Sequence, residues 1–429
     1  MSQSAFPAYR DQCGWNAMLP PRQARPHAVG SIRVRYAVVG AGYTGLAAAR
    51  RLHELDPDAS IAVLEASSVG EGASARNSGF MTPNDSKIGL STNEMARAEQ
   101  LNAFSAEGFS YLTDAMKAGG IVCDLERSGR VTAAATDLGA DKIHSMVEGA
   151  KRHGFAHQAL DREDLAGLIG SRYYQCGLRI EEGYLLQPAA LVRGLADTLP
   201  DAVRLYENTP VLELQDGAPW VLRTPEAVMT ADVVILATNA AIKHFGFWRD
   251  GLVTIYTFAG ISHAMAERDA ARLGTKPWGL LPAHRLGTTV RRVGADRLMV
   301  RSLYAYEKPL APLQVQEALT GCFHRRYPDL SHVPLQYIWG GTTALTMNGS
   351  PRWGRIKPHL YGSAGCNGSG IVKGTLLGKR LAEMIVTGDP QDRLQAVYGR
   401  ANRIAPEPFR TIGFHAISAY QRRKAGLEM

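Results

Sequence analysis

Hydrophobic residues in the first part of the chain fall into short continuous runs, separated by a run with helical spacing. Apolar strands are predicted at residues 31–40 and 61–65, with a helix between them at 47–55. Continuous apolar strands are typical of a parallel sheet that is buried on both faces. This order of elements therefore indicates a βαβ unit.

The pattern changes between about residues 245 and 335. Short alternating runs at 252–262, 287–293 and 297–303 predict an antiparallel sheet, followed by a helix at 312–327. Elsewhere the spacing predicts helices at 93–118, within 140–170, at 189–199 and at 376–385, and strands at 203–214, 220–224 and 231–237. The fold class is therefore α/β, with a second α+β domain built on the antiparallel sheet.

A Gly-x-Gly-x-x-Gly turn follows the first predicted strand. Gly40 permits the tight turn, Gly42 lets a pyrophosphate approach the backbone, and Gly45 lets the helix lie close to the strand. Tyr43 and Thr44 belong to the start of that helix, whose free N–H groups and dipole attract phosphate. The turn therefore predicts a nucleotide-binding site.

The second predicted strand ends in Glu65, followed by Ala66. A carboxylate at this place can accept hydrogen bonds from ribose hydroxyl groups. A loop rich in small residues comes next, and it is either a plain connection or a second cofactor clamp. In the second case the contacts would come from Ser74, Arg76, Asn77, Ser78 and Gly79.

The loop sequence Gly-Ala-Ser-Ala-Arg-Asn-Ser-Gly at 72–79 resembles the D-amino-acid oxidase-like family of FAD enzymes, which includes sarcosine and glycine oxidases. In that family the loop wraps the pyrophosphate and the edge of the flavin. Further resemblances lie at Val211, at Ala237 and Thr238, and at Gly341 in the run Trp339-Gly340-Gly341. They imply contacts with the adenine and with the flavin.

A glycine-rich turn near the C-terminal end also resembles the family. It implies that a helix N-terminus points at the flavin pyrimidine ring, where N–H groups stabilise negative charge. The residues implied are Gly368, Ser369, Gly370, Ile371 and Val372. No cysteine stands at Thr343, where some relatives link the flavin covalently, so non-covalent FAD is expected, with Cys366 as the open alternative.

Candidate catalytic residues are less well defined. Tyr256 and Tyr304 lie on predicted strands of the antiparallel sheet and could face the substrate, although aromatic strand residues usually pack in a core. Lys373 either adds a positive charge near the flavin or lies on a helix surface. An acidic substrate would need an arginine, for which the candidates are Arg285, Arg291, Arg292 and Arg301.

The resemblance divides the chain into segments. Residues 31–90, 150–244 and 336–390 form a discontinuous, Rossmann-like FAD-binding domain, and residues 91–149 and 245–335 form the substrate domain. Residues 1–30 are an N-terminal arm over the surface. Residues 391–429 form a basic C-terminal extension, expected to be a solvated tail on the surface.

Composition narrows the class of protein. The 429 residues are 45% hydrophobic and carry a formal charge of +8, which fits a two-domain globular protein with a solvated surface. The five cysteines are scattered, which argues against disulfides or a zinc site and favours a reducing compartment. With no signal peptide or membrane span apparent, a cytoplasmic protein without nucleic-acid partners or metal is expected.

The function implied is an oxidase, most like the gamma-glutamylputrescine oxidase or glycine and sarcosine oxidase branch. It would oxidise an amine or amino-acid C–N bond to an imine by hydride transfer to flavin N5. Oxygen would reoxidise the flavin and give hydrogen peroxide.

Three alternatives stay open. A flavin dehydrogenase would pass electrons to a quinone or a carrier protein. An NAD-dependent dehydrogenase would use the first glycine turn alone. A flavoprotein that binds RNA would use its positive charge, although no basic stripe interleaved with aromatic residues is present.

Overall fold

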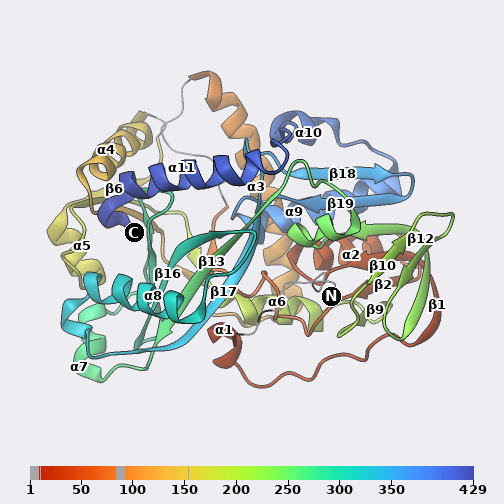
Figure 1. Ribbon diagram of the computed structural model, residues 1–429, viewed down its shortest axis with the longest axis horizontal. Coiled ribbons are helices and arrows are strands. Elements are labelled where there is room, and N and C mark those ends of the chain that lie inside the picture. The colour runs from red at the N-terminus through yellow and green to blue at the C-terminus, as the bar shows by residue number, and fades with distance from the viewer. Residues whose placement is uncertain (1–8, 10, 84–91, 153) are drawn as a thin grey trace.

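The computed structural model describes residues 9, 11–83, 92–152 and 154–429. Of the predicted N-terminal arm, residues 1–30, residues 1–8 and 10 lie outside this range. Residues 84–90 of the first predicted domain segment also lie outside it. The chain forms two large sheets. In Figure 1 the strands of the first sheet lie to the right and most strands of the second to the left.

The first sheet contains the predicted βαβ unit. Its strands run in the order β10 (Glu213–Gln215), β11 (Trp220–Arg223), β12 (Ala227–Leu236), β1 (Gly30–Val39), β2 (Ile61–Leu64) and β9 (Val203–Tyr206). The strands β12, β1, β2 and β9 are parallel, and β19 (Leu360–Ala364) joins β12 in parallel, with β18 (Arg352–Lys357) antiparallel to it. All four residues of β2 are buried, which explains its continuous apolar sequence.

The second sheet carries the predicted alternating strands. Its order is β17 (Leu335–Leu345), β13 (Val253–Ser262), β16 (Arg297–Tyr306), β15 (Thr289–Val293), β14 (Gly279–Pro282), β5 (Arg130–Ala134), β7 (Cys176–Ile180) and β6 (His157–Leu160). All neighbours are antiparallel except β14 and β5. A small third sheet pairs β3 (Phe80–Met81), β8 (Tyr184–Leu185) and β4 (Glu126–Arg127).

Three strands fall outside the domain segments that the sequence suggests. The predicted segments place β6, β7 and β17 in the FAD-binding domain, whereas their backbone hydrogen bonds lie in the second sheet. The reason is that long-range strand pairing decides the sheet to which a strand belongs, and a pattern along the chain does not record its partner.

Two helices converge on the end of the first sheet. α2 (Tyr43–Leu55) and α9 (Gly370–Thr387) pack closely, because Gly374 and Gly378 leave no side chain between α9 and Thr44. A Cβ at Gly374 would lie 3.0 Å from Thr44 Oγ1, and one at Gly378 would collide with the Thr44 carbonyl. Small residues thus bring the two helix N-termini together.

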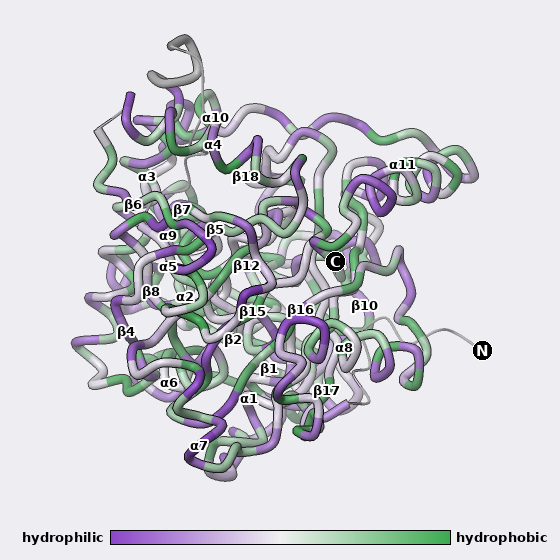
Figure 2. The backbone as a smooth tube through the Cα atoms, turned by 90° about the vertical axis from the view of Figure 1, so that its left-hand side faces the viewer, coloured by the Kyte–Doolittle hydropathy of each residue, from purple (hydrophilic) through white to green (hydrophobic). Residues whose placement is uncertain are grey.

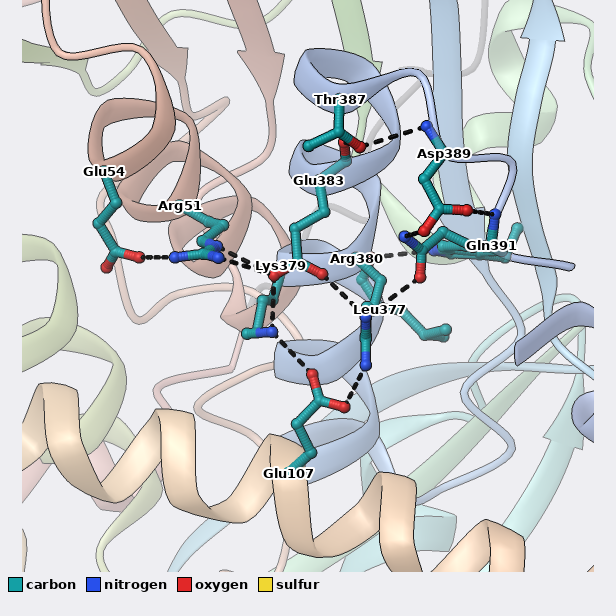
Figure 3. A network of polar contacts seen from close by, with 11 residues as sticks. Arg51, Glu54, Glu107, Leu377, Lys379, Arg380, Glu383, Thr387, Asp389 and Gln391 are labelled. Atoms are coloured by element: carbon teal, nitrogen blue, oxygen red, sulfur yellow. Dashed lines mark hydrogen bonds and ion pairs between the residues drawn. The ribbon is translucent and has the colours of Figure 1, made fainter. Parts of the chain in front are cut away.

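An ionic network holds α9 against its neighbours (Figure 3). Glu383 accepts hydrogen bonds from Arg51 of α2 and from Lys379 and Arg380 of its own helix. Glu107 of α3 (Thr92–Ala118) binds the same Lys379 and Arg380. One helix is therefore tied to two others by charges that are only partly exposed.

The remaining helices surround this frame. They are α1 (Gly14–Ala17), α4 (Asp137–Arg152), α5 (Arg162–Ile169), α6 (Pro188–Asp197), α7 (Glu267–Ala270), α8 (Pro312–Arg326), α10 (Asp392–Tyr398) and α11 (Phe409–Ala425), with 3₁₀ turns η1 (Asn239–Phe245), η2 (Ala271–Leu273), η3 (Pro328–Leu330) and η4 (Gly426–Glu428). In Figure 2, α11 lies at the edge of the molecule and carries both green and purple segments. Within the described ranges, no helix has the length and apolar character needed to cross a bilayer.

Candidate cofactor and substrate site

A cavity of about 1510 Å³ is lined by residues of both large sheets. Sites for a single small molecule usually occupy about 300–1,000 Å³. The larger volume leaves room for a dinucleotide and a substrate in one enclosure. The cofactor half is built on the ends of β1, β2, β12 and β19, and the substrate half on β13 to β16 and β5.

The glycine turn forms one end of the cofactor half. Gly40 has a φ of +104°, and a Cβ there would lie 2.8 Å from the Ala237 carbonyl oxygen. A Cβ at Gly42 would lie 2.7 Å from Ser74 Oγ, so glycine keeps this approach open. Gly40, Gly42, Tyr43 and Thr44 line the cavity, whereas Gly45 does not and packs against the Gly40 carbonyl.

Glu65 lies beside this turn. Its Oε2 accepts a hydrogen bond from Ala41 N at 2.8 Å, and its Oε1 accepts one from Ser67 N at 3.3 Å. Burial raises the pKa of the Glu65 carboxyl, although the hydrogen bond from Ala41 opposes this change. Glu65 and Ala66 both line the cavity, as does the buried Val211. All three residues therefore lie at the cavity, and their contacts with ribose and adenine stay predictions.

The small-residue loop lines the next part of the cavity, but its Arg76 is occupied by the protein. Its guanidinium donates to the carbonyl oxygens of Glu71, Gly340 and Asp11 at 2.8, 3.0 and 2.9 Å. It also lies 4.1 Å from the centre of the Tyr9 ring. The arginine therefore joins the loop to β17 and to the N-terminal arm, and a direct contact with a cofactor stays a prediction.

Asn77 likewise shapes the loop. Its Nδ2 donates to the Ser74 carbonyl at 2.6 Å, and its Oδ1 accepts from Gly79 N at 2.8 Å. Ser74, Asn77 and Ser78 line the cavity. Gly79 does not, because it is packed where a side chain would collide with the Leu186 carbonyl. Its positive φ of +73° also favours glycine.

The first turn of α9 lines the other end of the cofactor half. Gly368, Ser369, Gly370, Ile371, Val372 and Lys373 all contribute, together with Ala237, Thr238 and Gly341. The helix therefore presents its positive end to the cavity, as the sequence predicts. Lys373 is buried, and its Nζ lies 5.7 Å from the centre of the Tyr398 ring, which does not line the cavity.

The two candidate tyrosines have different surroundings. Tyr304 lines the substrate half, where its hydroxyl accepts from Arg301 Nη1 at 2.7 Å and donates to the Arg285 carbonyl at 3.0 Å. Tyr256 does not line the cavity and packs against the core of the substrate domain. Burial raises the pKa of the Tyr256 hydroxyl. Its partly buried side chain packs against the core and not into the cavity, so its position gives no support to the predicted catalytic contact.

The four candidate arginines divide in the same way. Arg285 and Arg301 line the cavity, whereas Arg291 and Arg292 do not. Arg291 donates to the Ser78 and Leu186 carbonyls, and burial lowers its pKa to about 10. Arg292 donates to backbone carbonyls on the outside of the sheet. The Arg291 and Arg292 side chains therefore hold backbone segments in place and do not face the cavity.

Several lining residues carry no signal in the sequence. Tyr9 comes from the N-terminal arm, and Arg130 and Lys142 come from β5 and α4. Within the predicted basic tail, α11 has mostly exposed side chains and also lines the cavity, with Phe414, Ile417, Ser418, Gln421 and Arg422. No motif marks these residues, because the tertiary fold alone brings distant segments to the cavity.

Comparison with known proteins gives the family. The model of the family DAO, FAD dependent oxidoreductase, matches residues 35–384. The chain belongs to this family of FAD-dependent oxidoreductases. The cofactor is therefore FAD, and the predicted resemblance is confirmed. The match decides against the alternative of an NAD-dependent dehydrogenase.

Individual relatives agree with this family. Gamma-glutamylputrescine oxidoreductase from Escherichia coli is 28% identical, over 83% of this chain and 84% of the relative. A glycine oxidase from Geobacillus kaustophilus has a TM-score of 0.72 at 18% identity, covering 87% of this chain and 100% of its own. An iminodiacetate oxidase from Chelativorans has a TM-score of 0.67 at 16% identity, covering 86% and 100%. The two structures share the fold.

The described residues fit FAD. Gly42 leaves an approach that a Cβ would fill, and two helix N-termini and the Glu65 carboxylate line the cavity beside it. Pyrophosphate is bound by this kind of arrangement, and ribose by a carboxylate in this position.

Proposed function

We propose that this protein oxidises the C–N bond of an amine or amino acid to an imine. Water then hydrolyses the imine to an aldehyde or oxo acid and releases ammonia or an amine. The observation that carries the proposal is the single cavity, which runs from the glycine turn to the polar floor of the second sheet. A substrate on that floor and the cofactor share one enclosure. The relatives are named as enzymes of amines and amino acids, which supports the same chemistry.

FAD, when bound, supplies the acceptor for the hydride. The chain supplies binding and polarity. The first turn of α9 lines the cofactor half and favours negative charge there. The antiparallel strands form the wall on which the amine would be oriented. Arg301, held by its hydrogen bond to Tyr304, is placed to bind a substrate carboxylate.

We propose oxygen as the electron acceptor and the cytoplasm as the compartment. All five cysteines are free, which is compatible with a reducing compartment. The alternative acceptor is a quinone or a carrier protein, which would leave turnover without hydrogen peroxide.

The test is an absorption spectrum of the purified protein, followed by anaerobic mixing with a panel of amines and amino acids. Oxidised-flavin bands that one compound bleaches are expected, with stoichiometric peroxide when air is admitted. Bleaching of the flavin without hydrogen peroxide would contradict the oxidase and favour the flavin dehydrogenase. A protein whose flavin no amine bleaches would contradict the proposed reaction.

FAD is proposed to be bound without a covalent link. Cys366 lines the cavity, and its Sγ lies 3.9 Å from Thr343 Oγ1, so a thiol is close to the place where some relatives are linked. We expect acid precipitation to release all the flavin into the supernatant. Flavin that stays in the pellet of the wild type, but not of Cys366→Ser, would contradict this expectation.

A further inference from the structure

Residues 9 and 11–28, which we call the N-terminal segment, contact the loop that follows β2. The family match begins at residue 35, and none of the predicted cofactor residues lies before Gly40. Cys13, Trp15 and Ala28 of the segment are nevertheless buried. The segment is therefore packed into the protein, and its contacts show what it packs against.

The first part of the segment holds two positions of the cofactor loop, which we define as residues 65–79. Trp15 Nε1 donates to the Asn77 carbonyl at 2.9 Å, and Asn16 Nδ2 donates to the Gly70 carbonyl at 2.7 Å. The Trp15 carbonyl in turn accepts from Gln187 Nε2 at 2.6 Å, at the start of α6. Asn77 and Gly70 line the cavity, so these contacts act on the wall of the cofactor half.

A buried carboxylate joins the second part of the segment to the same loop. Glu207 follows β9, and its side chain is fully buried. Its Oε1 accepts from Val69 N at 2.6 Å, and its Oε2 accepts from Arg25 N at 2.6 Å. Arg22 Nη1 donates to both oxygens at 2.8 Å. The cofactor loop is therefore fixed at Val69 by a carboxylate whose charge meets Arg22.

Arg22 supplies the positive charge at Glu207. Among the described residues it is the cation that forms an ion pair with this carboxylate. Arg22 Nη2 also binds Asp197 Oδ1, at the end of α6, at 2.7 Å. Asp197 is partly exposed, so water can replace that contact, whereas Glu207 is shielded from water. A buried carboxylate that loses its cation is strongly unfavourable.

The charge of Glu207 also acts on Glu65, the carboxylate predicted to bind ribose. Burial raises the pKa of Glu65, and the negative charge of Glu207 adds to this increase. Without Arg22, Glu207 would either keep an uncompensated charge near Glu65 or turn toward water and release Val69 N. Either change disturbs residues that form the cofactor half of the cavity.

We propose that Arg22 is a positioning residue for FAD. It neutralises Glu207 and thereby keeps the cofactor loop bound to that carboxylate, in the position that accepts FAD. The inference concerns the cofactor alone and does not depend on the substrate that is oxidised. It gives the N-terminal segment a role in cofactor binding, although no binding motif marks Arg22 in the sequence.

The proposal is tested by titrating FAD into flavin-free, full-length protein and following the flavin fluorescence. Arg22→Gln should raise the dissociation constant of FAD about tenfold, because Val69 is no longer held by a neutralised carboxylate. Hydrogen–deuterium exchange of the flavin-free variant should become faster in residues 65–79 and stay unchanged in α8 of the second domain.

Arg25→Gln is the matched control. The Arg25 side chain is exposed, and the residue contacts Glu207 through its backbone N–H, which the substitution keeps. The control removes the same charge from the same segment, and it should leave FAD binding and the exchange of residues 65–79 unchanged. Equal losses in Arg25→Gln and Arg22→Gln would overturn the proposal, because the net charge of the segment would then account for both.

Two further variants separate the ion pair from packing. Arg22→Gln/Glu207→Gln leaves no buried charge without a partner, so it should bind FAD about threefold more tightly than Arg22→Gln. Arg22→Lys keeps the charge but loses the planar fork, so it should weaken FAD binding about threefold, and it serves as the test where Arg22→Gln does not fold. Wild-type affinity in every folded single variant of Arg22, or a double variant that binds no better than Arg22→Gln, would overturn the proposal.

Discussion

At the scale of single residues, the cofactor half depends on glycines, which leave space for a ligand, and on side chains that hydrogen-bond to the backbone of the surrounding loop. Gly42 leaves open the space in which a Cβ would meet Ser74 Oγ. Arg76 donates to carbonyl oxygens of three separate segments, at Glu71, Gly340 and Asp11. The first residue admits the ligand, and the second holds the loop around it.

Replacing Gly42 by leucine should abolish FAD binding. The added side chain would occupy the approach between the turn and Ser74, and the packed loop cannot move away without losing its own hydrogen bonds. Flavin content after purification and after reconstitution measures the effect. Gly167→Leu is the control, because Gly167 is exposed on α5 with open space around it. A flavin-replete Gly42→Leu protein would contradict the assignment of the turn.

Arg76→Lys should destabilise the protein even without cofactor. Lysine cannot reproduce the three directed contacts, so buried carbonyl groups lose their donors, at a cost of about 2 kcal/mol in the free energy of unfolding. Urea unfolding of flavin-free protein gives this value. Arg33→Lys, in an exposed pair with Asp232, should change it by less than about 0.5 kcal/mol. If the two substitutions had equal effects, Arg76 would not be the clamp of the loop.

At the scale of elements, α9 carries its charge network at one end and the cofactor site at the other. The network of Glu383 and Glu107 with Lys379, Arg380 and Arg51 fixes how α9 lies on α2 and α3. The first turn of the same helix lines the cavity. Partly buried ion pairs far from the ligand therefore set the direction in which the helix N-terminus points.

The network also predicts a pH dependence. Burial alone would raise the pKa of Glu383, but the hydrogen bond from Lys379 and the nearby positive charges lower it below the ordinary value of 4.5. A carboxyl whose pKa is lower in the folded state adds stability above the unfolded pKa, and this stability is lost as the pH falls through the folded pKa.

We therefore expect wild type to exceed Glu383→Gln in the free energy of unfolding at neutral pH. The difference should shrink steadily as the pH falls below 4.5. Urea unfolding of both proteins over a pH series measures it. A difference that is the same at all pH values would show that packing, and not ionisation, accounts for the effect of the substitution.

At the scale of the whole molecule, the site is assembled from segments at both ends of the chain. Tyr9 of the arm and Arg422 of α11 line one cavity together with residues of both large sheets. In Figure 1, α11 crosses the upper part of the molecule between the label of α4 and that of α10. The substrate half is complete only when the last residues are in place.

Glu428→Ala should loosen α11. The substitution leaves the buried N–H of Ala135 and the partly buried N–H of Thr136 without their acceptor, which should cost about 2 kcal/mol in the free energy of unfolding. Hydrogen–deuterium exchange should become faster in residues 409–425, with β1 and α2 unchanged as the internal reference. Unchanged exchange in α11 would mean that the stack of Phe414 on Tyr306 is sufficient to hold the helix.

The sequence by itself determined the nucleotide-binding half of this protein. The glycine turn, the acidic strand end and the glycine-rich start of α9 are local devices, because backbone approach and helix dipole depend on residues close together in the chain. The positions Gly40, Gly42, Glu65 and 368–372 accordingly all line the cavity. The change from continuous to alternating apolar runs likewise indicated the second sheet.

Only the tertiary structure decided the substrate half. Strand pairing placed β6, β7 and β17 in the second sheet. It also left Tyr256 packed against the core outside the cavity, and Tyr304 in the cavity. The fold brought α11, within the expected basic tail, to the cavity as well. Side chains along a strand alternate between two faces, and the sequence does not show which face meets a ligand. Contacts between residues hundreds of positions apart leave no local sequence pattern. The cofactor could therefore be predicted from the sequence, whereas the substrate could not.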